Sequence, residues 1–273
     1  MNRFEGILIC TDLDGTLYKK DKTISKENRE AIDYFKSEGG LFTFITGRMP
    51  YYSMDAYRNA APNVPFGCVN GGGLYDGEKM EYIWKTPMPC QVFELVKHVE
   101  EHFSNVGIQV SCFDKTHFVK ENSAMARFRR LTGVPNLACR IEDVKDHIAK
   151  IIFGSESEAE LLGIEKLLRA HPSASKFDFI RSERTLFEIV PKGVDKGLAL
   201  VKLTEYLGTD INKTVALGDY NNDIGMLKAA RLGIAVANAC KEALAAADCI
   251  TVSNEDHAIA RTIYDIEHGR YTF

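Results

Sequence analysis

Short, uninterrupted runs of apolar residues recur near both ends of the chain, and stretches with helical periodicity separate them. The runs at residues 7–10 and 41–45 predict strands that are buried on both faces of a parallel sheet. Between them, Ser25 is a typical helix N-cap, an apolar stripe follows it, and Gly39-Gly40 ends the helix. The alternation continues with a helix and a strand at residues 51–59 and 66–69.

The C-terminal part of the chain repeats this pattern. Its predicted elements alternate between helix and strand, and they lie at residues 193–207, 214–217, 224–230, 233–236, 241–247, 249–252 and 256–264. Alternating strands and helices imply right-handed crossovers and a doubly wound parallel sheet.

The middle of the chain follows a different pattern. Paired apolar runs at residues 108–113 and 117–120 predict one hairpin, and those at residues 176–180 and 185–190 predict another. Helices lie between these paired runs. The middle therefore favours an antiparallel sheet that carries helices on one face.

Together the two patterns predict an α/β fold in which one domain interrupts another. Residues 1–85 and 190–273 form a doubly wound, Rossmann-like parallel core, and residues 86–189 form an inserted α+β domain. The chain has 273 residues, of which 45% are hydrophobic, so it can bury a substantial core.

Charge and cysteine content narrow the expected partners and compartment. The formal net charge is -4, and both signs are scattered along the chain, so neither nucleic acid nor a membrane is an expected partner. The seven cysteines form no Cys-x-x-Cys pair, which is typical of reduced thiols in the cytoplasm. A monomer or homodimer is the default expectation for the assembly.

The sharpest chemical signal is the segment Asp12-Leu13-Asp14-Gly15-Thr16, which directly follows the first predicted strand. Ligands of open parallel sheets bind at the carboxyl ends of the strands. Two carboxylates in one pocket require a cation, and Mg²⁺ prefers oxygen ligands. An acidic turn that merely ends a strand is the alternative interpretation.

Three further polar segments follow or precede predicted core elements. Thr46-Gly47-Arg48 follows the second strand and offers a hydroxyl group and backbone N–H groups to a phosphate oxygen. Asp219 and Asp223 lie four residues apart where a strand gives way to a helix. Lys196 stands at the start of another predicted helix. Taken singly, these segments are equally well explained as helix caps and a solvated lysine.

In this order along the chain, the four segments closely resemble the haloacid dehalogenase superfamily. The resemblance covers the whole chain and includes Asn70-Gly71-Gly72 and Asn238. It is closest to the Cof-type phosphatases, whose cap domain is inserted between the Thr and Lys motifs. It implies a Mg²⁺-dependent phosphatase that hydrolyses phosphomonoesters of small metabolites, such as sugar phosphates or phosphorylated cofactors and nucleotides, through an aspartyl-phosphate intermediate.

The resemblance also implies a role for each residue of these segments. Asp12 is the expected nucleophile, and Asp14 is the expected acid that protonates the leaving oxygen and later deprotonates water. The residues expected to bind or orient the phosphoryl group are Thr46, Gly47, Arg48, Lys196 and Asn222. The expected Mg²⁺ ligands are a carboxylate oxygen of Asp12, the backbone carbonyl of Asp14, and Asp219, with Asp223 as a further ligand or a support behind the ligands.

Two expectations extend this assignment. Because Asp14 must be protonated in the first step, we expect burial and nearby negative charge to raise its pKa. A phosphometabolite-binding sensor that has lost turnover is the alternative function, although every catalytic position is present. A phosphomutase, and a structural module whose acidic residues lie apart, are the remaining alternatives.

One further motif lies outside these segments. The segment His98-Val99-Glu100-Glu101-His102 matches the inverted zincin pattern, in which two histidines stand four residues apart. Helical spacing puts Val92, Val96, Val99 and Phe103 on one stripe, and the histidines lie on the other side. We therefore interpret the motif as a solvated helix face.

Overall fold

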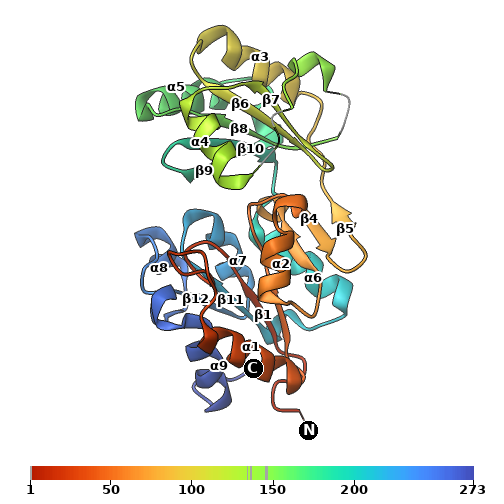
Figure 1. Cartoon of the computed structure of the whole chain (residues 1–273), viewed down its shortest axis with the longest axis vertical. Helices are drawn as coiled ribbons and strands as arrows, with labels where there is room; N and C mark the ends of the chain where they lie inside the picture. Colours follow the sequence, from red (N-terminus) through yellow and green to blue (C-terminus); the bar gives the residue numbers. More distant parts are fainter. Residues whose placement is uncertain (1, 134, 136, 145–146) are drawn as a thin grey trace. The chain divides into compact units, whose positions relative to one another are not determined.

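The structure, a computed structural model, describes residues 2–133, 135, 137–144 and 147–273, and the chain divides into two compact units (Figure 1). The core unit comprises Met1–Lys85 and Asp195–Phe273, and the inserted unit comprises Thr86–Val194. The expected insertion ended at residue 189. Strand β10 (Leu186–Pro191) runs past this point because it pairs with β9 (Phe177–Glu183) as far as Pro191.

A five-stranded parallel sheet forms the centre of the core unit, which confirms the predicted α/β fold class. The strand order is β13-β12-β11-β1-β2. The strands are β1 (Leu8–Thr11), β2 (Leu41–Phe44), β11 (Thr214–Gly218), β12 (Leu232–Ala235) and β13 (Cys249–Ile250). The chain steps from β1 to β2 on one side and later returns to β11 on the other side of β1. The strand order therefore reverses at β1, where sheets of this kind bind their ligands.

Helices precede or follow these strands along the chain. They are α1 (Lys26–Ser37), α2 (Met54–Ala60), α6 (Lys196–Leu207), α7 (Ile224–Ala229), α8 (Lys241–Ala246) and α9 (Ala258–Glu267). As predicted, Ser25 caps α1, and its hydroxyl oxygen accepts the N–H of Asn28. Leu8 and Cys10 of β1 pack with residues of α6, α7 and α8 in one apolar cluster. Helices α1 and α9 lie side by side (Figure 1).

The prediction that the strand at residues 66–69 continues the parallel sheet is wrong. Strand β3 (Phe66–Cys68) belongs to a separate antiparallel sheet with β4 (Gly73–Asp76) and β5 (Glu81–Lys85). A single parallel bridge between Ile45 and Gly67 connects it to the end of β2. The pattern of the sequence did not predict β4 and β5, because β5 is half exposed and lacks a buried apolar run.

The inserted unit contains a five-stranded antiparallel sheet with the order β7-β6-β8-β10-β9. Its other elements are β6 (Gly107–Cys112), β7 (Thr116–Lys120), β8 (Ile148–Gly154), α3 (Val92–His102), α4 (Ser123–Thr132) and α5 (Glu158–Arg169). Both predicted hairpins are confirmed as β6–β7 and β9–β10. The apolar sides of α3 and α5 pack with alternate residues of β6, β8 and β10 in one core.

The state of the cysteines and the lengths of the helices relate to the expectations drawn from composition. All seven cysteines lie in the described part of the chain and are free thiols. Among the described residues, every helix is too short or too polar to cross a bilayer.

Candidate active site

Asp12 stands at the carboxyl end of β1 and makes a buried ion pair. Its N–H donates to the carbonyl of Leu217 at 2.9 Å, which continues the pairing of β1 with β11 by one residue. The ammonium of Lys196 donates to Oδ1 of Asp12 at 2.5 Å and to Oδ1 of Asp223 at 2.6 Å. Lys196 is fully buried at 0% exposure. The fold therefore brings together three predicted residues from distant segments, since the carboxylates of Asp12 and Asp223 share the ammonium of Lys196.

The acidic loop that follows β11 adds Asp219 to this group. Oδ2 of Asp223 accepts the N–H groups of Asp219 and Tyr220, each at 2.9 Å, and so fixes the loop ahead of α7. Oδ1 of Asp219 accepts the hydroxyl of Thr16 at 2.8 Å. Asp223 is thus engaged in holding the loop and Lys196. Asp219 is held by Thr16, which follows the neighbouring parallel strand β1 at the same edge of the sheet.

Gly15 permits the close approach between the two loops. Its φ is +90°, a backbone conformation that residues with a side chain rarely adopt. A Cβ atom at this position would also lie 2.4 Å from Oδ2 of Asp219, closer than atoms can approach. The Nδ2 group of Asn238 donates to the carbonyl of Gly15 at 2.8 Å and holds the loop from a third side. Any larger residue at position 15 would therefore push the carboxylate of Asp219 away.

The group carries more negative charge than its one ammonium neutralises. Burial raises the pKa of Asp12 well above its ordinary value against the opposing charge of Lys196, and the other carboxylates add to the rise. Burial and the charge of Asp223 raise the pKa of Asp219 to about 6. Burial alone would lower the pKa of Lys196, but the charges of Asp12 and Asp223 outweigh it and raise this pKa. The carboxylates are therefore short of positive charge.

This shortage fits a divalent cation. Asp12, Asp219 and Asp223 each offer a carboxylate oxygen, and these oxygens lie within 4.8 Å of one another. Hard cations such as Mg²⁺ prefer oxygen ligands, and two added positive charges would offset the two carboxylates that Lys196 leaves unbalanced. The donor set of this unit thus matches the predicted metal on both chemistry and charge.

Asp14 lies in a second ion-pair group close to the first. Arg48 donates through Nη2 to both carboxylate oxygens of Asp14, at 2.8 Å and 2.7 Å, and through Nε at 3.1 Å. Lys22 donates to Oδ1 of Asp14 at 2.8 Å. Arg48, predicted to bind the phosphoryl group, therefore contacts the predicted proton donor in this structure.

The expectation of a raised pKa for Asp14 is wrong here. Burial alone would raise the pKa of Asp14, but the charges and hydrogen bonds of Arg48 and Lys22 outweigh burial and hold it below its ordinary value. No local sequence pattern predicted these two partners of Asp14. Lys22 belongs to a polar loop, and Arg48 lies 34 residues away along the chain.

Thr46, Gly47 and Asn222 lie around Asn70, and a Cβ atom on Gly47 would be 2.6 Å from Oδ1 of Asn70. Thr46 is 2% exposed, its carbonyl accepts the N–H of Asn70 at 3.1 Å, and its hydroxyl oxygen accepts the N–H of Arg48 at 3.3 Å. Oδ1 of Asn70 accepts from Nδ2 of Asn222 at 3.1 Å. Asn70 therefore ties the loop after β2 to the acidic loop after β11. The motif Asn70-Gly71-Gly72 pointed to Asn70 in the sequence, but it did not predict the contact with Asn222.

Thr16 and Lys22 also contact residues of the site, and neither had an expected role from the sequence. Thr16 belongs to the segment that carries Asp12, so its position in the motif was visible, but its bond to Asp219 joins residues 203 apart. Such long-range partners follow from the strand order and leave no local pattern in the sequence.

Comparison with known proteins agrees with this geometry. Residues 9–263 match the family model for haloacid dehalogenase-like hydrolases. A 5-amino-6-(5-phospho-D-ribitylamino)uracil phosphatase of Bacillus subtilis is 26% identical over 259 residues, which cover 93% of this chain and 95% of the relative. A pyridoxal phosphate phosphatase of Escherichia coli is 28% identical over an alignment that covers 94% of this chain and 97% of the relative.

Solved structures give the same result. The crystal structure of a haloacid dehalogenase-like hydrolase from Bacteroides thetaiotaomicron superposes with a TM-score of 0.83 at 26% identity, over 95% of this chain and 99% of that one. The match includes both units of the chain. With the acidic loops and the buried lysine in place, the chain belongs to the family of haloacid dehalogenase-like hydrolases.

Proposed function

We propose that the protein is a Mg²⁺-dependent phosphatase that hydrolyses phosphomonoesters of small metabolites through a phosphorylated Asp12. The observation that carries the proposal is the buried ammonium of Lys196, which joins Asp12 to Asp223 beside Asp219 at the carboxyl ends of β1 and β11. Relatives that match nearly the whole chain are named phosphatases of a ribitylaminouracil phosphate and of pyridoxal phosphate. Both names describe small phosphorylated metabolites.

Hydrolysis proceeds in two steps in this proposal. A carboxylate oxygen of Asp12 attacks phosphorus, the bond between phosphorus and the ester oxygen breaks, and Asp14 gives its proton to that oxygen. Water then attacks the phosphorus of the aspartyl phosphate while Asp14 takes a proton from it. Inorganic phosphate leaves, and Asp12 returns to its starting form.

The ion pairs of Asp14 define what must change when substrate binds. Arg48 and Lys22 stabilise the ionised form of Asp14, which has no proton to donate. A phosphate group brings negative charge that competes for the same two cations. We infer that Arg48 exchanges Asp14 for a phosphate oxygen. This exchange raises the pKa of Asp14 and reconciles its role with that of Arg48 as a substrate-binding residue.

The remaining residues hold the phosphoryl group and its charge. Lys196 favours the ionised form of Asp12 and faces the negative charge that develops on the equatorial oxygens. Thr46 and the backbone after β2 supply further donors, and Asn222 is held in position by Asn70. Mg²⁺, held by Asp12, the carbonyl of Asp14 and Asp219, with Asp223 as a further ligand or support, would supply charge neutralisation.

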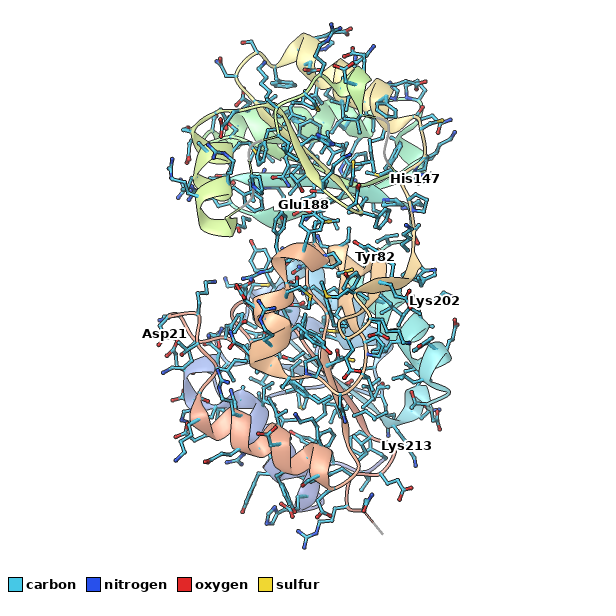
Figure 2. All side chains as sticks on the ribbon, turned by 45° about the vertical axis from the view of Figure 1, so that its right-hand side comes forward. Asp21, Tyr82, His147, Glu188, Lys202 and Lys213 are labelled. Carbon is cyan, nitrogen blue, oxygen red and sulfur yellow. The ribbon has the colours of Figure 1, made fainter. Side chains whose placement is uncertain are left out.

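A screen for phosphate release tests the proposal. Purified protein is incubated with Mg²⁺ and a panel of sugar phosphates, nucleotides and phosphorylated cofactors, and the compounds are ranked by kcat/KM. We expect phosphate release from several of them and none with Asp12→Asn. The matched control is Asp21→Asn, which removes the same charge from an exposed loop (Figure 2).

Two outcomes would contradict the proposal. Turnover that survives in Asp12→Asn would remove Asp12 from the chemistry. Tight binding of a phosphorylated metabolite without any release of phosphate would favour the sensor instead.

A further inference from the structure

The histidine motif on α3 places three metal-binding groups on one side of the helix. His98, Glu101 and His102 each offer a ligand atom, and these atoms lie within 4.8 Å of one another. We propose that they form a surface site for a first-row transition-metal ion, with Zn²⁺ as the physiological candidate. The site uses imidazole nitrogens, whereas the carboxylate group of the core unit offers oxygens alone.

The hydrogen bond of His102 prepares its ring for a metal. Nδ1 of His102 lies 2.8 Å from the carbonyl oxygen of His98. A carbonyl oxygen only accepts, so Nδ1 carries the proton and Nε2 keeps its lone pair. Metal-binding histidines in proteins are commonly held by this kind of bond from the second ring nitrogen to a backbone carbonyl. His102 is an exposed residue.

The separations suit tetrahedral coordination after small side-chain movements. Nδ1 of His98 lies 3.9 Å from Oε2 of Glu101. Two tetrahedral ligands, each roughly 2 Å from Zn²⁺, are about 3.3 Å apart. The side chain of Glu101 is 70% exposed and rotates freely enough to close this difference. Three protein ligands leave one position for water or a fourth ligand.

The helix that carries these groups is anchored on its other side. Val92, Leu95, Val96 and Val99 of α3 are buried in the core of the inserted unit. The backbone that presents the two histidines is therefore fixed, and the ring centroids of His98 and His102 already lie 4.5 Å apart. A rigid helix reduces the ordering cost of binding a metal.

A third histidine nearby is excluded from the ligand set by its own hydrogen bond. The ring centroid of His171 lies 5.5 Å from that of His98. Its Nδ1 accepts the N–H of Ser173 at 3.2 Å, so the proton of this ring is on Nε2 and neither nitrogen offers a lone pair. His171 consequently provides a control within the same cluster.

His268 provides a second control elsewhere. Its Nδ1 also lies 2.8 Å from the carbonyl of the residue four positions earlier, but that residue is Tyr264. It reproduces the geometry of His102 at the end of α9 without a second histidine. A single imidazole on a surface does not chelate.

Isothermal titration of untagged protein with Zn²⁺, under saturating Mg²⁺, tests the proposal. Mg²⁺ occupies oxygen sites and leaves imidazoles open. All proteins carry Cys90→Ser, because Cys90 is the exposed thiol among the seven. We expect one Zn²⁺ per chain, a loss of affinity of at least about tenfold in His98→Ala and in His102→Ala, and a smaller loss in Glu101→Gln.

The controls decide whether the ligand set is correct. His171→Ala and His268→Ala are expected to bind Zn²⁺ with unchanged affinity. Ni²⁺ and Cu²⁺ are expected to follow the Irving–Williams order at the same site, with Cu²⁺ tightest. Imidazole ¹⁵N spectra are expected to show a shift of Nε2 of His102 on addition of Zn²⁺.

Either of two results would overturn the proposal. One is binding in His98→Ala and His102→Ala that equals binding in the parent protein. The other is binding that disappears in Asp219→Asn but persists in the histidine variants, which would assign the metal to the carboxylates of the core unit.

Discussion

The two units of the chain each bury a lysine, and the two lysines differ in what surrounds them. In the inserted unit, Lys150 of β8 donates to Oε2 of Glu188 of β10 at 2.8 Å, and the two side chains are 6% and 4% exposed (Figure 2 labels Glu188). In the core unit, Lys196 faces Asp12 and Asp223, with Asp219 beside them. Burial is therefore common to both lysines, whereas excess negative charge is a feature of the core unit.

This difference separates a structural pair from a chemical site. The charge of Glu188 matches that of Lys150, so the pair holds two strands together without a requirement for a further ion. The carboxylates around Lys196 exceed its charge, and this excess raises the pKa of Asp12 and Asp219. Holding these carboxylates together costs folding free energy, so the group is a strong candidate for a functional site.

The largest expected effect is on turnover. In the proposed mechanism the ammonium of Lys196 favours the ionised form of Asp12 and faces the transferring phosphoryl group, so we expect Lys196→Met to lower kcat on the order of 10³-fold. Steady-state assays on the best substrate of the screen measure this loss. Retention of more than a tenth of the wild-type kcat would contradict the role given to Lys196.

The second effect is on stability and belongs to the inserted unit. Lys150→Met leaves Glu188 buried without this partner, and breaking such a pair costs about 3–5 kcal/mol of unfolding free energy. The double variant Lys150→Met, Glu188→Leu is expected to recover most of this loss, because no charge then remains to be buried. Urea unfolding, monitored in both units, measures the loss of unfolding free energy and its recovery. Equal stability of the single and double variants would show that the pair is not the source of the loss.

The third effect links pH to the metal. The pKa of Asp219 rises from 3.8 in the unfolded chain to about 6 in the folded one, so the folded state binds more protons between these values. Without a metal ion, the core unit therefore loses stability as pH rises from 3.8 to about 6, by a few kcal/mol at most. Asp14, whose pKa is lowered, acts in the opposite sense and only as pH falls below its ordinary value.

Mg²⁺ is expected to reverse this loss. Because the metal binds the ionised carboxylates, its stabilising effect should be larger at pH about 7.5 than at pH about 5. Urea midpoints of the core unit, measured with Mg²⁺ or with EDTA at both pH values, give the comparison, and Asp219→Asn serves as the control. An effect of Mg²⁺ that is the same at both pH values, or the same in Asp219→Asn, would contradict the assignment.

The smallest effect concerns the cations that hold Asp14. Arg48→Ala removes three of the hydrogen bonds to its carboxylate, so the pKa of Asp14 is expected to rise and the alkaline limb of the pH–rate profile to move to higher pH. We expect kcat/KM to fall about tenfold, because Arg48 is also the proposed partner of a phosphate oxygen. Lys22→Ala should move the limb in the same direction by less, since its side chain is 65% exposed. An unchanged profile in both variants would remove Asp14 from the rate-limiting proton transfer.

The parallel core was predictable from the sequence because burial on both faces leaves a clear signal. Strands such as β1 and β11 are continuous apolar runs, and the polar residues that follow them, Asp12 and Asp219, meet because parallel strands end at one edge. The hairpin of β4 and β5 left no such signal. Its second strand is half exposed, and its turn contains Met80 with a φ of +59°, which no local pattern announces.

The partners within the site were harder to predict than its members. Asp14 was identified as a member from the motif, but its contacts with Arg48 and Lys22 depend on how three loops converge. The same holds for the histidines of α3. Their spacing was visible in the sequence, but the contact between Nδ1 of His102 and the carbonyl of His98 depends on the side-chain conformation of His102, which the spacing does not determine.

The most direct test of the account is to trap the phosphorylated enzyme. In the proposed mechanism Asp14 deprotonates water in the second step, so Asp14→Asn should slow that step. p-Nitrophenyl phosphate needs little help to lose its leaving group, so the first step should then be faster than the second. After acid quench and digestion, mass spectrometry is expected to find one phosphoryl group on the peptide that contains Asp12, and none when Asp12→Asn is added. Release of nitrophenol by Asp14→Asn without a phosphoryl group on Asp12, or with one on another residue, would contradict the account.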